Sequence, residues 1–288
     1  MIWRFGEQSF DLSLRGLIVG IVNVTPDSFS DGGAFTDPKV ACFQGLKLLD
    51  EGADLLDIGG ESTRPGAAPV SEEEEIRRVI PVISILRRKT SAPISIDTSK
   101  PSVAEAALKA GATIINDVTA LRGDTRMGSL VAESGAGLIL MHMQGMPETM
   151  QQAPCYPDDD IAAEVAKFLS ERRATAIGLG VAPSSIILDP GLGFGKTVAH
   201  NLALLREIPT LASLGAPLMI GHSRKSFLGV ITGATDSATR LPAGIAVTSL
   251  ARKAGALLFR VHDATPHREA LRMTEAVMHA SSDNEVAS

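Results

Sequence analysis

The feature that most constrains the fold of this chain is an alternation of short apolar runs with longer segments of helical periodicity. Near-continuous apolar runs are typical of parallel strands covered on both faces, and their alternation with helices indicates βαβ units. Eight runs follow this pattern, at residues 17–25, 54–60, 93–99, 113–119, 137–143, 186–191, 217–223 and 257–263. The helical segments between them are clearest at residues 38–51, 71–89, 101–110 and 265–280.

The junctions between these segments show where the long loops lie. Five apolar runs are preceded by Gly-Ala, at residues 52–53, 111–112, 135–136, 215–216 and 255–256. A glycine just past a helix end supplies a left-handed cap, so we expect short helix-to-strand turns. The strand-to-helix loops 26–37, 60–70 and 144–157 are long. Eight units with long loops on one side predict a (β/α)8 TIM barrel with its active site at the carboxyl ends of the strands.

A doubly wound sheet is the alternative architecture. It usually carries a glycine-rich phosphate turn after its first strand, whereas residues 23–33 read NVTPDSFSDGG. The barrel therefore fits the sequence better. Residues 3–5 and 10–12 predict a short N-terminal β-hairpin that closes the bottom of the barrel. We expect a single domain over residues 1–280 and a polar, disordered tail at 281–288.

Composition excludes several classes of protein. The chain has 288 residues, of which 44% are hydrophobic and 21% charged, so it is neither disordered nor collagen-like. A net charge of −6 argues against a protein that coats nucleic acid. No apolar run approaches the roughly 18 residues that span a membrane, and the N-terminus lacks the apolar stretch of a signal peptide. Cys42 and Cys155 have no metal-type or redox-type spacing, so we expect free thiols in a cytoplasmic protein.

Polar side chains gather at the ends of the predicted strands. Each apolar run finishes in such groups, namely Asn23, Asp57, Glu61, Asp97, Asn116, Asp117, His142, Asp189, His222 to Lys225, Arg260, His262 and Asp263. Any one of them taken alone is more readily explained by the capping of a neighbouring turn. The polar ends of all eight runs together predict a ligand site, because barrel enzymes place their catalytic residues at these ends.

The residue types in this set indicate the kind of ligand. Arginine and lysine suit a phosphate group, and the cations of the loop face are Arg64, Arg224, Lys225, Arg260 and His262. Asn23 offers an uncharged oxygen for a hydrated Mg²⁺ that phosphates already hold. The acceptors of Asp97, Asn116 and Asp189 suit a planar heterocycle with several N–H donors. Phe29 and Phe194 lie in loops where a ring can stack on a ligand.

Several other patterns point to no chemistry. The segment 191–197 ends like a Walker A loop, but Pro190 stands where that motif requires glycine. No set of His, Cys or Glu residues has zinc spacing. His142 is better interpreted as a packed residue at a strand end than as a general base. The remaining histidines in helical segments are expected on the surface, namely His200, His267 and His279.

Eight strings of the sequence together resemble the dihydropteroate synthase family. They are GIVNVTPDSFSDGG (20–33), DIGGESTRPGA (57–67), SIDTSKP (95–101), INDV (115–118), LMHMQGMP (140–147), LDPGLGFGK (188–196), SRKS (223–226) and RVHD (260–263). They occur in the family's order and span nearly the whole chain. The first two strings are long and very specific. The family fold is the (β/α)8 barrel that the alternation of segments also predicts.

The resemblance implies a transferase of folate biosynthesis that works as a homodimer and is the target of sulfonamides. It joins para-aminobenzoate to 6-hydroxymethyl-7,8-dihydropterin diphosphate and releases pyrophosphate, with Mg²⁺. Pyrophosphate leaves from a carbon next to an electron-rich ring, so an SN1-like path is expected. Loops 26–37 and 60–70 would exclude the water that otherwise traps the cation. The neutral aniline nucleophile needs little activation, which agrees with the absence of an obvious general base.

The resemblance also implies roles for individual residues. The implied catalytic residues are Asn23, Asp97, Lys225, Arg260 and His262. The implied pterin contacts are Asp97, Asn116, Met141, Asp189 and Lys225. The implied diphosphate contacts are Asn23, Arg64, Arg260 and His262, with Asn23 also meeting the metal. The implied aminobenzoate pocket comprises Thr63, Arg64, Pro65, Phe194 and Ser226, while Phe29 belongs to the mobile first loop.

One position departs from the commonest family pattern, and two other functions remain as alternatives. His222 stands where some members have methionine, and we expect it to add polarity near Lys225. A pterin-binding methyltransferase barrel would not need the strings SRKS and RVHD. A non-catalytic pterin-binding paralogue would be favoured by the loss of Asn23, Arg260 or the first loop, none of which is lost.

Overall fold

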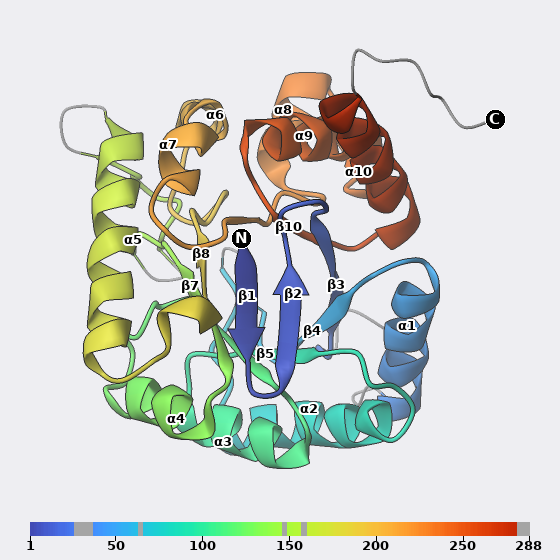
Figure 1. Cartoon of the computed structure of the whole chain (residues 1–288), viewed down its shortest axis with the longest axis vertical. Coiled ribbons are helices and arrows are strands. Elements are labelled where there is room, and N and C mark those ends of the chain that lie inside the picture. Colours follow the sequence, from blue (N-terminus) through green and yellow to red (C-terminus); the bar gives the residue numbers. More distant parts are fainter. Residues whose placement is uncertain (26–36, 63–65, 146–148, 157–159, 281–288) are drawn as a thin grey trace.

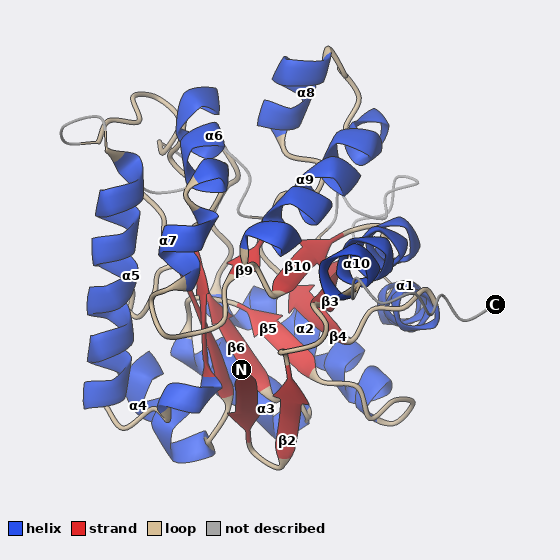
Figure 2. Ribbon diagram, turned by 45° about the horizontal axis from the view of Figure 1, so that its top comes forward, coloured by secondary structure: helices blue, strands red, loops and turns tan. Residues whose placement is uncertain are grey.

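The computed structural model describes residues 1–25, 37–62, 66–145, 149–156 and 160–280. The strands are β1 (Ile2–Phe5), β2 (Gln8–Asp11), β3 (Leu17–Asn23), β4 (Leu55–Gly59), β5 (Ile94–Asp97), β6 (Ile114–Asp117), β7 (Gly137–Met141), β8 (Ile186–Asp189), β9 (Met219–Ile220) and β10 (Leu258–Val261). The α-helices are α1 (Pro38–Asp50), α2 (Glu72–Arg87), α3 (Pro101–Ala110), α4 (Arg126–Ser134), α5 (Ile161–Gly178), α6 (Val198–Arg206), α7 (Ile208–Ala212), α8 (Ser226–Thr232), α9 (Leu241–Ala254) and α10 (Ala264–His279). Figures 1 and 2 show the helices arranged around the strands.

The strands from β3 to β10 form a parallel barrel. Their order is β8-β7-β6-β5-β4-β3-β10-β9. A parallel bridge between Leu188 and Leu218 joins the two edges, and the Leu188 N–H donates to the Pro217 carbonyl at 3.0 Å. This closure confirms the predicted (β/α)8 barrel and excludes the open doubly wound sheet.

The N-terminal hairpin closes one end of the barrel, as predicted. Strands β1 and β2 pair antiparallel, with Trp3 opposite Phe10. Trp3 is fully buried, and its indole N–H donates to the carbonyl of Ser185, just before β8, at 3.0 Å. Trp3 and Phe5 pack against the lower inward-facing side chains of the barrel, which are Leu17, Val19, Leu55, Ile114, Ile139, Ile187, Met219 and Leu258.

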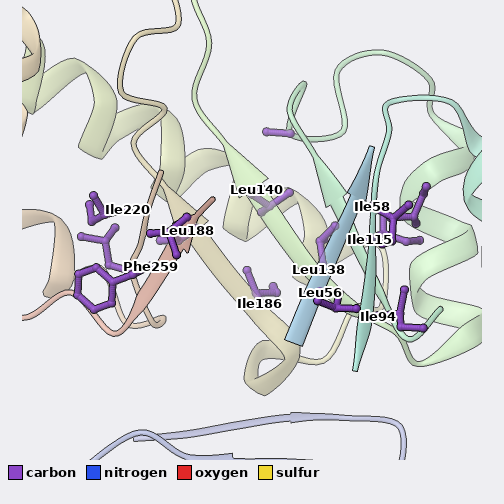
Figure 3. Close-up of a cluster of buried hydrophobic side chains, with 14 of the residues drawn as sticks. Leu56, Ile58, Ile94, Ile115, Leu138, Leu140, Ile186, Leu188, Ile220 and Phe259 are labelled. Carbon is purple, nitrogen blue, oxygen red and sulfur yellow. The ribbon is translucent and has the colours of Figure 1, made fainter. Parts of the chain in front are cut away.

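The main core lies between the barrel and its helices. It is built from side chains on the outer faces of the strands, of which Figure 3 labels Leu56, Ile58, Ile94, Ile115, Leu138, Leu140, Ile186, Leu188, Ile220 and Phe259. Full burial of one such aliphatic side chain stabilises the fold by roughly 1.5–3 kcal/mol. Because both faces of these strands are buried, the strands are apolar over most of their length, and most of their polar residues stand at or near their carboxyl ends.

The helix ends are formed as their residue types predict. Gly111, Gly135 and Gly255 adopt left-handed conformations with φ of 112°, 66° and 113° at the ends of α3, α4 and α9. Asp37 begins α1 by accepting from the Lys39 N–H at 2.9 Å. The turns into the following strands are therefore short, and the long loops gather at the carboxyl ends of the strands.

Two expectations about the chain as a whole can be compared with the described residues. Within them, no helix is long and apolar enough to cross a membrane. Cys42 is buried and Cys155 exposed, and both are free thiols, as expected.

Candidate active site

Arg260 is the central cation at the carboxyl ends of the strands. Its Nε donates to Asp57 Oδ2 at 2.6 Å, and its Nη2 donates to Asp97 Oδ2 at 2.8 Å. These side chains come from β10, β4 and β5. A guanidinium carries five N–H donors, and these two ion pairs use two of them. The carboxylates thus hold the cation in place while it keeps donors for a further anion.

Asp57 and Asn116 present buried acceptors to the same space. The Asn116 side-chain amide donates to Asp57 Oδ2 at 3.1 Å, and both residues are buried. Asp57 Oδ1 and Asn116 Oδ1 have no hydrogen-bond donor within the described part of the chain. Buried acceptors without a donor are rare in native proteins. Their presence here indicates a ligand that supplies N–H groups.

Asp189 and Lys225 face each other beside Gly221. A Cβ on Gly221 would lie 3.6 Å from Asp189 Oδ2 and 3.9 Å from Lys225 Nζ, so glycine keeps the space between the two charges open. The Gly191 N–H donates to Asp189 Oδ1 at 2.7 Å, and Lys225 Nζ donates to the Leu192 carbonyl. The site therefore offers an acceptor and a donor side by side, which matches the edge of a heterocycle that has both kinds of group.

Burial shifts the titration of these groups. It raises the pKa of Asp97 to about 7, because the attraction of Arg260 offsets the desolvation only in part. It also raises the pKa of Asp189 and lowers the pKa of Lys225 to about 8, against the opposing effect of Asp189. Groups perturbed in this way cluster at functional sites.

A second polar region follows β9 and β10. The Nδ1 atom of His262 lies 3.0 Å from Ser223 Oγ, within hydrogen-bond distance. The backbone N–H of His262 donates to the same oxygen at 3.2 Å. Arg224 instead forms a bidentate pair with Asp263, with Nε–Oδ2 and Nη2–Oδ1 distances of 3.1 and 2.7 Å. The predicted anion site thus contains His262 and Arg260, whereas Arg224 is committed to a carboxylate.

Asn23 lies where a metal ion carried by a phosphate could bind. A Cβ on Gly59 would lie 3.9 Å from Asn23 Oδ1 and 3.8 Å from Asp97 Oδ2, so the two oxygens flank an open space that glycine provides. Oxygen donors of this kind suit Mg²⁺ that keeps most of its coordination to phosphate and water. The described residues hold no group of three or more His, Cys, Asp or Glu side chains that could bind a metal alone. The residues therefore fit an ion that arrives with its phosphate ligands.

An apolar wall completes the described site. Phe194 packs against a cluster that contains Met141 together with Val118, Met143 and Met150. The Nζ of Lys225 lies 4.5 Å from the centroid of the Phe194 ring, which is a cation–π distance. Ser226, the next residue after Lys225, is exposed at the start of α8.

Four predicted site residues cannot be placed. Thr63, Arg64, Pro65 and Phe29 lie outside the described residues. All others meet around one end of the barrel: Asn23, Asp97, Asn116, Met141, Asp189, Phe194, Lys225, Ser226, Arg260 and His262.

One expectation about histidines was wrong, and one was right. His267 is 1% exposed rather than on the surface, because it binds Thr248 Oγ1 at 2.7 Å between α9 and α10. His222 is fully buried, and its Nε2 lies 3.0 Å from both Gly244 O and Thr248 Oγ1. That it adds polarity near Lys225 stays a prediction. His142 is buried and packs edge-on to Phe168 at the end of β7, as a packed histidine should.

Sequence reasoning gave no site role to two residues that the structure makes important. Asp57 was recognised only as a polar strand end, and Ser223 only as part of a matching string. The signal for Asp57 was a charge inside a run that is otherwise apolar, DLLDIGG. A carboxylate at 0% exposure requires a cationic partner, and Arg260 could have been proposed for it.

The fold and this geometry define a class of protein, a (β/α)8-barrel enzyme that binds a planar heterocycle beside an anion. Residues 19–262 match the family described as pterin binding enzyme. A dihydropteroate synthase of Neisseria meningitidis serogroup C is 46% identical over 280 residues, which cover 96% of this chain and 97% of the relative. The chain belongs to the dihydropteroate synthase family, whose members are transferases.

Solved structures agree with this assignment. The Xanthomonas albilineans dihydropteroate synthase with 4-aminobenzoic acid has a TM-score of 0.90 and 46% identity, and covers 97% of this chain and 99% of its own. The same enzyme in complex with 7,8-dihydropteroate has a TM-score of 0.88 and 44% identity, and covers 98% of this chain and 100% of its own. The resemblance found in the sequence strings is thus confirmed along the whole chain.

Proposed function

We propose that the chain carries out the family reaction through the residues described above. It joins para-aminobenzoate to 6-hydroxymethyl-7,8-dihydropterin diphosphate, forms 7,8-dihydropteroate and releases pyrophosphate. The observation that carries this proposal is that two pairs of polar side chains lie together at one end of the barrel. Asp189 with Lys225 suits the pterin edge, and Arg260 with His262 suits the diphosphate.

The pterin is held by complementary hydrogen bonds. Its ring and amino N–H groups would donate to Asp97, Asp189 and the unpaired oxygen of Asn116, while Lys225 donates to a ring acceptor. Met141 packs against the ring face. The buried Oδ1 of Asn116, which has no hydrogen-bond donor among the described residues, supports this arrangement, because the pterin would satisfy it.

The diphosphate binds to Arg260 and His262 and leaves from the pterin methylene carbon. As the C–O bond breaks, negative charge grows on the leaving group, and the Arg260 guanidinium and the His262 imidazole stabilise it. Asn23 would hold Mg²⁺, which when bound would supply further neutralisation of this charge. Arg260 needs no reorientation for this role, because Asp57 and Asp97 already fix its plane.

The aminobenzoate amine then attacks the methylene carbon in an SN1-like step. Its ring would pack on Phe194 beside Lys225, with Ser226 at the entrance and Thr63, Arg64 and Pro65 completing the pocket. The amine is neutral and loses its proton after the C–N bond forms. A neutral aniline places a low demand on a general base, so we assign none.

We further propose a cytoplasmic homodimer. Exposed apolar side chains on three neighbouring helices support the dimer, namely Val230 of α8, Leu250 of α9 and Met273 and Val277 of α10, which are between 65% and 69% exposed. Sedimentation at several concentrations would test it, and a monomer at all concentrations would contradict it.

Pyrophosphate release from the dihydropterin diphosphate with Mg²⁺ tests the reaction directly. We expect release that depends on para-aminobenzoate, with dihydropteroate formed in equal amount. Tight pterin binding without release would instead favour the non-catalytic paralogue. Omission of Mg²⁺ in the same assay tests the requirement for the ion.

A further inference from the structure

The segment 192–195 is held in an unusual way. Each of its four consecutive carbonyls accepts a hydrogen bond from a different side chain. The donors are Lys225 to Leu192, Gln151 to Gly193, Lys196 to Phe194 at 3.0 Å, and Tyr156 to Gly195 at 2.8 Å. The segment has no regular secondary structure to satisfy its backbone. Its shape, and thus the place of the Phe194 ring, depends on these donors.

Lys196 differs from the other three donors in its surroundings. It is 3% exposed, and its Nζ lies 2.9 Å from His142 Nδ1 and 3.5 Å from the His142 carbonyl. No carboxylate forms an ion pair with it in the described part of the chain. Burial therefore lowers the pKa of Lys196 well below its usual value. A buried amine without a carboxylate is costly, so a purely structural position would favour an apolar residue.

His142 is a suitable acceptor for this amine. Burial and the neighbouring Lys196 lower its pKa to about 2, so the imidazole is neutral, and in the tautomer with its proton on Nε2 the Nδ1 atom accepts the hydrogen bond. The ring is fixed by edge contacts with Phe168 and the His142 backbone N–H donates to Asp189 O at 2.9 Å. Lys196 thus connects the Phe194 carbonyl to the rigid end of β7.

The two ends of the segment pack closely against a neighbouring backbone. A Cβ on Gly191 would approach the His142 carbonyl to 1.9 Å, and a Cβ on Gly195 would approach the Gln144 carbonyl to 2.4 Å. The loop therefore lies directly against the chain that follows β7. The Lys196 amine occupies the junction between these two backbones and binds both.

We propose that Lys196 is a positioning residue that sets the affinity for the aminobenzoate by fixing Phe194 through its carbonyl oxygen. This inference rests on the proposed role of Phe194 as part of the aminobenzoate pocket. Because Lys196 is 3% exposed and its amine binds His142 and the Phe194 carbonyl, we expect it to contact neither substrate. Its loss should change the second substrate's binding and leave the pterin grip of Asp189 and Lys225 largely intact.

The test compares K196M with wild type and with K109M, which makes the same substitution at an exposed lysine of α3. We expect K196M to raise the KM for para-aminobenzoate about tenfold, the effect of one lost buried hydrogen bond. The dissociation constant for the pterin, measured by calorimetry, should change less than about twofold. A lysine with a merely structural role would shift the KM for para-aminobenzoate and the dissociation constant for the pterin together. An unchanged KM, or equal shifts, would overturn the proposal.

Hydrogen exchange provides a readout that needs no activity. Amides of residues 191–196 should exchange faster in K196M than in wild type, while those of β7 and β8 keep their rates. Exchange rates in residues 191–196 that are equal in K196M and wild type would refute the positioning role. Failure of the wild-type protein to make dihydropteroate would instead contradict only the proposed function, and the exchange test would still stand. If K196M does not fold, H142F removes the acceptor and keeps the ring contacts. It should show the same selective changes.

Discussion

The Nζ of Lys225 lies 4.5 Å from the centre of the Phe194 ring and beside the Asp189 carboxylate. One ammonium group therefore connects the proposed pterin contacts with the proposed aminobenzoate pocket. Its burial lowers its pKa to about 8, which leaves it mainly charged at neutral pH. The two substrates are expected to meet at this cation.

Replacement of this lysine should abolish most activity. We expect Lys225→Ala to lose activity with the fold retained, because the side chain donates to the Leu192 carbonyl and faces Asp189 without belonging to the apolar core. The turnover assay and circular dichroism check the two parts of the prediction. Near-normal turnover would contradict the assigned role. Lys109→Ala on the exposed face of α3 is the matched control.

Loss of the charge on Asp189 should weaken pterin binding. Asp189→Asn keeps an oxygen for the Gly191 N–H but removes the negative charge beside Lys225. We expect a loss of more than about 1 kcal/mol in pterin binding, the scale of a lost charge-assisted hydrogen bond. Calorimetry with a dihydropterin measures it. Unchanged affinity would show that Asp189 only holds the backbone at Gly191 and does not bind the pterin.

Removal of the Asp57 carboxylate should impair Arg260 specifically. Asp57 lies beneath the guanidinium and binds its Nε at 2.6 Å. In Asp57→Asn the plane of Arg260 is held mainly by Asp97, so we expect kcat to fall about tenfold or more, the effect of at least about 1.4 kcal/mol. Pterin without diphosphate should bind nearly as well as before. A pterin affinity that falls in step with kcat would argue against this division of roles.

Pterin binding should depend on pH near neutrality. Burial raises the pKa of Asp97 to about 7, so the carboxyl of the free protein gains a proton as the pH falls through that value. A protonated carboxyl loses one acceptor for the pterin N–H groups. We expect affinity to drop by up to about tenfold from pH 8 to pH 6. Asp97→Asn should bind more weakly and show a flatter profile, which calorimetry across this range measures.

His222 and His267 should make the fold sensitive to acid. Burial lowers their pKa values from 6.5 to about 3 and about 4. Because these values are depressed, the unfolded chain takes up protons first, and stability present above about pH 6.5 is lost as the pH falls toward them. Between pH 7 and pH 5.5 we expect the free energy of unfolding to fall by about 1 kcal/mol less in His222→Met than in wild type. Urea unfolding at both pH values provides the measurement, and parallel losses in variant and wild type would disprove it.

The sequence by itself determined the elements and the ends of the strands. Apolar runs and helix periodicity show which face of a segment is buried, and Gly-Ala caps show where a helix ends. All three are local signals, because each is contained within a single segment of the sequence. They located the hairpin, the eight strands and the polar residues at their carboxyl ends. The matching strings then gave the family, because a string such as GIVNVTPDSFSDGG is specific without any knowledge of its surroundings.

Only the tertiary structure decided which of these residues act together. Asp57 and Arg260 are 203 positions apart, and they form an ion pair because β3 pairs with both β4 and β10. Tertiary packing likewise buried His267 between α9 and α10, paired Arg224 with Asp263 and placed the Lys196 amine between two backbones. Side-chain pairing across a barrel depends on strand order and register, and these are fixed by long-range packing that leaves no local periodicity in the sequence.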